Sequence, residues 1–236
     1  MTVRDRPIII GAVLAVAILM IGGLYVLRNG NNGGGVSASR KPVKPLAYAQ
    51  EINNSMDAIH PPTVVAIVNG RDISGAEVIY VAKVLKYIQY QDYYSNTKIN
   101  GKSVGVPVQS ASYFLNNAIK DLVTWEVIYQ YAEQHNIAAT PREAASNIAQ
   151  VNSASAIGPA YSYREALAMF AGTKSMAGLV SNRLALYKNI RKLSMFNVMA
   201  KFGVKSGPGY NAAFASYKEA MEKAKAAATI SILWQP

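Results

Sequence analysis

Two short strand-like runs stand near opposite ends of a chain whose other patterned segments favour helices. Residues Thr63–Val68 read TVVAIV, a β-branched run that is too short for a helix and fits a buried strand. Residues Ala228–Leu233 form a similar run directly after a long helical segment. Since each run has few other possible partners, we expect the two to pair in one small sheet that closes the domain.

The residues after the first run predict a turn and the start of a helix. Asn69 and Gly70 both tolerate positive φ, so the pair is typical of a tight hairpin turn. Arg71–Ile73 would then be a short return strand. Ser74 with Glu77 three residues later has the spacing of a reciprocal capping box, which predicts that a helix starts at Ser74.

Helical periodicity dominates the rest of the chain and predicts a mainly α fold. A second capping box is expected at Thr140 and Glu143, with Pro141 at the first helical position, after a break at Asn136 and Ile137. Loops are predicted over residues 95–108 and 152–159, and a turn over 205–209. The predicted helices cover residues 46–59, 74–94, 110–135, 140–151, 163–170, 175–202 and 210–227.

A long apolar segment near the N-terminus predicts a membrane anchor. Residues Pro7–Leu27 contain no charge, and 21 residues at 1.5 Å rise reach about 31 Å, enough to cross a bilayer core. A cleaved signal peptide is the alternative, with Val36–Ala38 as its cleavage site, although the apolar run is long for one. We therefore expect an anchor over residues 1–28, a flexible linker with a short helix over 29–62, and a folded domain over 63–236.

The hairpin and capping box together resemble the start of SurA/PrsA-like chaperone domains. The residues that carry this resemblance are Val65–Ser74, VAIVNGRDIS, with Glu77. The resemblance extends over residues 63–233, because a long helix, a break and a capped helix follow in the same order. It implies a membrane-anchored, single-pass extracytoplasmic protein of bacteria that binds unfolded or exported polypeptides without ATP. The basic residues on both sides of the apolar segment do not decide its orientation by themselves.

No enzymatic activity is expected. In relatives that carry a parvulin prolyl isomerase, this module lies before the final helix and needs about 90–100 residues, the size of a small domain. The five residues 205–209 cannot hold it. The chain has no cysteine, and its two histidines, His60 and His135, are far apart, so we expect neither a metal site nor another cofactor. A scaffold or accessory subunit of a membrane complex is the main alternative function, and a prolyl isomerase is the second.

A row of tyrosines on the first predicted helix is the candidate polypeptide-binding site. Tyr80, Tyr87 and Tyr94 recur every seven residues, and Tyr90 lies on the same arc. Such a row either packs against a neighbouring helix or forms a partly exposed aromatic groove. A groove of this kind would suit unfolded chains, since tyrosine combines a large apolar face with a hydroxyl group.

The positive charge of the chain is concentrated in the stretch from Ala166 through Lys218. The net charge is +11, and no Asp or Glu occurs from Ala166 through Lys218. These basic residues form either a solvated helix face or a surface that contacts anionic lipid or wall polymer. Nucleic acid is disfavoured as a partner, because no reader motif is present. The candidate contact residues are Lys174, Arg183, Lys188, Arg191 and Lys192.

Overall fold

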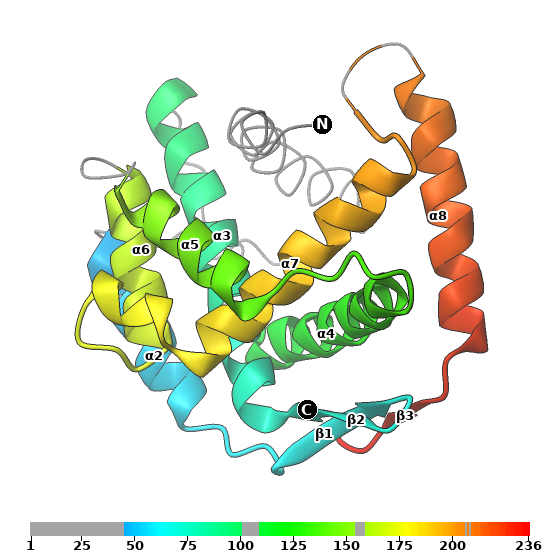
Figure 1. Ribbon diagram of the computed structural model, residues 1–236. Helices are drawn as coiled ribbons and strands as arrows, with labels where there is room; N and C mark the ends of the chain where they lie inside the picture. Colours follow the sequence, from blue (N-terminus) through cyan, green and yellow to red (C-terminus); the bar gives the residue numbers. More distant parts are fainter. Residues whose placement is uncertain (1–44, 101–108, 154–158, 206, 208) are drawn as a thin grey trace.

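The computed structural model describes residues 45–100, 109–153, 159–205, 207 and 209–236 (Figure 1). Within these ranges the chain forms seven α-helices, one short 3-10 helix and a three-stranded antiparallel sheet. The predicted anchor at 7–27 and the linker up to residue 44 lie outside the described residues. Among the helices that are described, none combines the length and apolar character that a membrane crossing requires.

The sheet brings the two strand-like runs together, as predicted. Strand β1 (Val64–Val68) lies between β2 (Arg71–Ser74) and β3 (Ile230–Ile232), and both pairings are antiparallel. Asn69 and Gly70 have φ values of 49° and 80°, the positive values that a two-residue hairpin turn needs. The Asn69 side chain also accepts a hydrogen bond from the Thr229 backbone amide at 2.7 Å, which fixes the start of β3 beside the turn.

Both predicted capping boxes are present. Helix α3 (Gly75–Asn100) follows Ser74, whose amide donates to Glu77 Oε2 at 2.9 Å while the Glu77 amide donates to Ser74 Oγ at 3.3 Å. Helix α4 (Ala111–Gln134) follows. Asn136, at φ 55°, lies in the non-helical segment between α4 and α5 (Pro141–Ser153). Thr140 and Glu143 exchange the equivalent bonds at the start of α5, at 2.8 and 3.2 Å. These short-range signals therefore set where the helices begin.

The predicted end of the helix that starts at Ser74 and the predicted start of the helix at residue 163 are both wrong. Helix α3 continues to Asn100 rather than ending near residue 94, because residues 95–100, although mostly polar, include no Gly or Pro. The remaining part of that predicted loop, 101–108, lies outside the described residues, as does 154–158 of the second. Helix α6 (Pro159–Phe170) starts four residues earlier than expected, with a proline at its first position.

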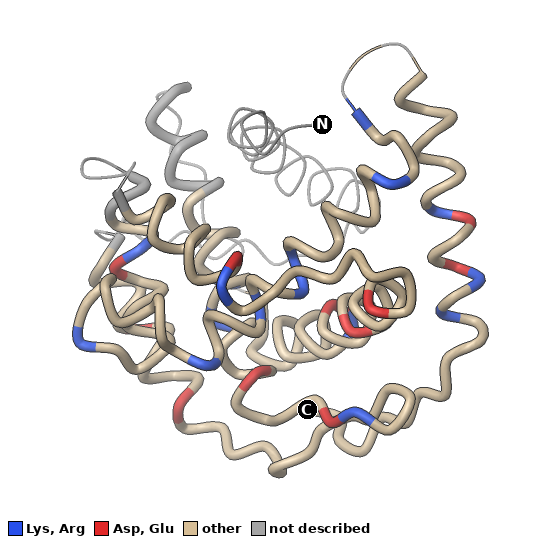
Figure 2. Tube along the Cα trace, viewed as in Figure 1, with Lys and Arg blue, Asp and Glu red and all other residues tan. Residues whose placement is uncertain are grey.

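The single helix predicted over 175–202 is two elements. The 3-10 helix η2 (Met176–Val180) ends before Asn182, and α7 (Arg183–Lys201) begins there. Asn182 is the N-cap: its side-chain oxygen accepts from the Ala185 amide at 3.1 Å, and its side-chain nitrogen donates to the Ala171 carbonyl at 3.0 Å. Local capping thus overrides the helical periodicity. Basic but no acidic residues lie along α7 (Figure 2).

The short helix assigned to the linker is part of the folded domain. Helix α2 (Pro45–Asp57) buries Ala49, Ile52 and Met56 completely in the main core. Lys83 of α3, only 3% exposed, donates to Asp57 at 2.5 Å and to Asn53 at 2.7 Å, which joins α2 to α3. Helix α2, predicted as part of the linker over 29–62, therefore shares its core with the domain predicted over 63–236.

Two hydrophobic clusters hold the helices together. The main cluster takes most of its buried residues from β1, β2 and helices α2, α3, α4 and α6, together with Leu179 of η2 and Ala185 of α7. A second cluster joins α4, α7 and the last helix, α8 (Tyr210–Ala227), which leads to β3 as predicted. The buried members of this second cluster are Ile128, Ala132, Val198, Met199, Tyr217 and Met221.

Candidate functional site

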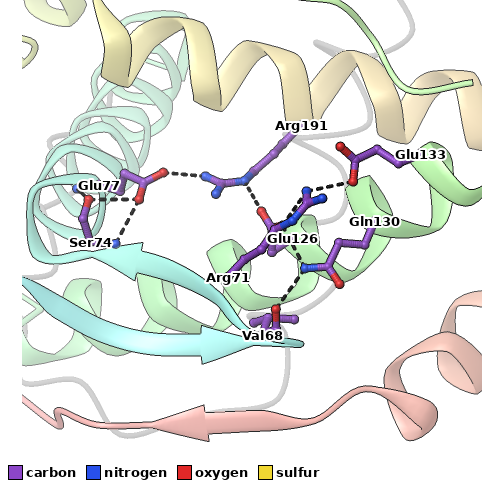
Figure 3. A network of polar contacts seen from close by, with 8 residues as sticks. All are labelled: Val68, Arg71, Ser74, Glu77, Glu126, Gln130, Glu133 and Arg191. Atoms are coloured by element: carbon purple, nitrogen blue, oxygen red, sulfur yellow. Dashed lines mark hydrogen bonds and ion pairs between the residues drawn. The ribbon is translucent and has the colours of Figure 1, made fainter.

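A buried ionic network connects the hairpin with three helices (Figure 3). Arg191 of α7 is its centre: Nη1 lies 2.6 Å from Glu77 Oε1 at the start of α3, and Nε lies 2.8 Å from Glu126 Oε2 in the middle of α4. Arg191 is 5% exposed and Glu126 is 2% exposed. Charges buried this deeply require partners, and each of these side chains has them.

The other half of the network holds the hairpin against α4. Gln130 Nε2 donates to the Val68 carbonyl and to Glu126 Oε1, both at 3.0 Å. Arg71 of β2 lies 2.7 Å from Glu133 Oε2 and 3.6 Å from Glu126 Oε1. The hairpin turn and the middle of α4 are thus joined through side chains as well as through the core.

The charges of the network stabilise one another. Burial by itself would raise the pKa of Glu77, but the Arg191 charge and the hydrogen bonds from Ser74 outweigh it, so this pKa is lowered. For the cation Arg191, burial by itself would lower the pKa, but the charges of Glu77 and Glu126 outweigh it, so this pKa is raised. Both groups are therefore fixed in their charged forms. Such an arrangement cross-links the fold and leaves neither Glu77 nor Arg191 poised to exchange a proton near neutral pH.

The prediction that Arg191 contacts an anionic surface is wrong, because this side chain is buried and paired. Its partners are distant in sequence: Glu126 is 65 residues away and Glu77 is 114 residues away. Sequence reasoning assigned Glu77 only to its capping box and did not identify the network. The absence of acidic residues near Arg191 in sequence made it look unpaired.

The tyrosine row lies in the core rather than in a groove. Tyr80 and Tyr90 are each 3% exposed, and Tyr87 is fully buried. Tyr87 packs edge-on against Phe170 of α6, with ring centroids 5.9 Å apart, and Tyr90 stacks on Tyr48 of α2 at 4.1 Å. Burial raises the pKa of Tyr87 to about 12.

Tyr80, Tyr87 and Tyr90 therefore pack against neighbouring helices, which was one of the two interpretations of this row. The other interpretation, an exposed aromatic groove, is wrong for these three residues, because α2 and α6 cover the arc. The side chain of Tyr94 lies outside the described residues.

The remaining basic candidates differ in how far they are exposed. Lys174 and Arg183 are exposed, while Lys188 and Lys192 are partly buried on α7. Lys188 Nζ lies 5.6 Å above the Tyr80 ring, and Lys192 Nζ lies 5.9 Å from the centre of the Phe196 ring. Burial, with repulsion from Lys192, lowers the pKa of Lys188 to about 7, and burial also lowers that of Lys192. Contact with anionic lipid or polymer stays a prediction, carried best by Lys174 and Arg183.

Two of the exposed large apolar side chains in the described part of the chain are neighbours on the closing strand. Ile232 and Leu233 are adjacent at the end of β3 and are 43% and 56% exposed. Leu46 and Tyr187 are the other large apolar side chains with more than a third of their surface exposed, and each stands on a different helix. Sequence reasoning identified β3 as a strand but did not predict this exposure.

The fold and the network define a mainly α domain that is closed by a sheet of sequence-distant strands and is fixed by buried ion pairs. Comparisons with protein-family models, with curated proteins and with solved structures found no match to this chain.

Proposed function

We propose that this chain is a membrane-anchored, extracytoplasmic chaperone-like protein that binds non-native exported polypeptides. The observation that carries the proposal is the pairing of β3 with β1 beside the Asn69–Gly70 turn. The residues that carry the SurA/PrsA-like resemblance flank this turn, and the resemblance extends to residue 233, at the end of β3. The apolar segment at 7–27 is the proposed anchor.

The order of helices gives further support to this proposal. A long helix, a break at a left-handed Asn136 and a capped helix follow the hairpin in the order that the resemblance implies. Residues 202–209 separate α7 from α8, too short a segment for an isomerase module of about 90–100 residues. Binding would therefore act by covering apolar segments transiently, without ATP and without covalent chemistry.

The direct test is suppression of client aggregation by the full chain in lipid nanodiscs. Two unrelated, chemically unfolded proteins are diluted into buffer with and without the chain, and light scattering is followed. We expect a weak but measurable reduction of scattering for both clients at a few-fold molar excess. No reduction for either client would reject the proposal. A single stoichiometric partner recovered from native membranes would favour a scaffold subunit instead.

Orientation is tested separately in intact protoplasts. The proposal requires that protease added outside digests the domain that follows the apolar segment. Protection of the domain from the protease would place it in the cytoplasm and would contradict an extracytoplasmic function.

A further inference from the structure

The free edge of β3 has backbone groups available for another strand. Because β1 is the central strand, β3 is an edge of the sheet. The Asn69 amide donates to the Thr229 carbonyl and the Leu233 amide donates to the Val65 carbonyl, each at 2.8 Å. In an antiparallel ladder, bonding to one neighbour involves alternate residues, so Ile230 and Ile232 direct their amide and carbonyl groups away from β1.

These outward groups have no partner within the described residues. Neither Ile230 nor Ile232 has a backbone hydrogen bond beyond its strand there, and β1 is the only described element that packs substantially against β3. Two residues offer two donors and two acceptors at the spacing of an extended chain. Another extended backbone is the structure that satisfies all four together.

The side chains at this edge favour an apolar occupant. Ile230 and Trp234 pack against the core, and Ile232 lies between them on the same face of β3. Ile232 is nevertheless 43% exposed, because no described strand covers it from beyond the edge. An added strand with apolar residues at alternate positions would cover this side chain as it pairs.

The two edges of the sheet differ in how they are protected against pairing with another strand. The β2 edge carries the charged residues Arg71 and Asp72, which disfavour pairing with another chain. No charged residue occurs from Ala226 to Pro236, so β3 lacks that protection. Its length of three residues limits pairing to a few bonds, which suits weak and reversible binding.

We propose that the free edge of β3 binds an extended apolar segment of a client polypeptide by adding it to the sheet as a fourth strand. The inference rests on the proposed function, and it replaces the tyrosine row as the client-binding site. Recognition would come mainly from backbone hydrogen bonds, which is the reason that it tolerates many client sequences.

The test compares two peptides on the unmodified full chain in nanodiscs. One is a fluorescent nine-residue peptide that alternates valine and threonine between terminal lysines. The other has the same sequence with alternate backbone amides methylated, so that one edge cannot donate hydrogen bonds. We expect the methylated peptide to bind at least about tenfold more weakly by fluorescence anisotropy, the effect of losing two or more hydrogen bonds.

Two variants at one position test the edge from the side of the protein. Ile232→Pro removes an amide that faces away from β1, so the domain should fold while peptide binding falls about tenfold. Ile232→Val keeps the amide and the β-branched side chain, and it should bind like the original chain. If Ile232→Pro does not fold, as judged by circular dichroism, the comparison of the two peptides still decides.

The remaining outcomes separate this inference from the proposed function. Equal binding of the two peptides would overturn the β3 site, as would no peptide binding by a chain that does suppress aggregation. The chaperone proposal would survive both results. A dimer that Ile232→Pro converts to a monomer would show that the edge pairs with a second copy, which also overturns a client site. If the unmodified chain neither binds the peptide nor suppresses aggregation, both proposals are rejected.

Discussion

Replacing Arg191 by methionine should separate a buried structural role from a surface role. Methionine keeps most of the aliphatic length of the side chain but removes both charged contacts. Glu77 would keep its bonds from the Ser74 amide and hydroxyl. Glu126 would keep only the bond from Gln130 and the longer contact with Arg71 at 3.6 Å, while it remains almost completely buried.

The expected loss is large because a buried carboxylate is left without its closest partner. Removing one member of a buried ion pair typically costs about 3–5 kcal/mol in the free energy of unfolding. We expect Arg191→Met to fall in that range, with a decrease in Tm of about 6–20 °C for a domain of this size. A surface arginine would change stability by less than about 0.5 kcal/mol.

Urea unfolding of the full chain in detergent, followed by circular dichroism, measures this difference. Glu126→Gln provides a matched double-mutant cycle, because it removes the charge and keeps the shape. The double variant should lose at least about 1 kcal/mol less than the sum of the single losses. A loss below about 1 kcal/mol for Arg191→Met, or fully additive effects, would refute the proposed coupling.

The same network predicts a dependence of stability on pH. The pKa of Glu77 is lower in the folded state than its ordinary value of 4.5. Its stabilisation is therefore complete above about pH 4.5 and is lost as the pH falls through the lowered folded-state value. Arg191→Met should remove most of this acid dependence. An acid transition unchanged by that substitution would show that other groups cause it.

Three further predictions concern the core, the sheet and α7. Tyr87→Ala should cost about 3–5 kcal/mol of stability, since the ring is fully buried. Tyr87→Phe should cost only about 0.5–1.5 kcal/mol, because it removes the hydroxyl's hydrogen bond with Gln91 and its 3.5 Å contact with the Ser162 carbonyl but keeps the ring. Thermal unfolding distinguishes the two variants, and equal losses would contradict core packing as the main role of the ring. Deleting residues 229–236 should expose β1 as an edge and cause aggregation, which sedimentation detects; an equally soluble and stable truncated chain would contradict the role of β3. Lys188→Met should stabilise the domain most at pH 6, and the gain should shrink as the pH rises from about 7 toward 10.5, because the pKa of Lys188 is lowered to about 7 in the folded state. A gain that does not change with pH would show that Lys188 is charged in the folded domain throughout this range.

Local signals in the sequence were sufficient for most of the secondary structure. The positive φ values of Asn69 and Gly70, and the boxes formed by Ser74 with Glu77 and Thr140 with Glu143, depend only on neighbouring residues. Pairing of β3 with β1 was also predictable, since the chain offers few other strand partners. The extra turn of α3 and the break at Asn182 were missed, because composition and periodicity gave no decisive signal for them.

The sequence by itself therefore determined where most helices and strands form, while the tertiary structure decided which of their faces are covered. A row of tyrosines fits a core as well as a groove, and only the packing of α2 and α6 on α3 buries Tyr87. An arginine on a basic helix fits a surface until Glu77 and Glu126 approach it from 114 and 65 residues away. Burial and pairing depend on such distant contacts, and the energy of a charge or a ring is set by its surroundings rather than by its neighbours in the chain.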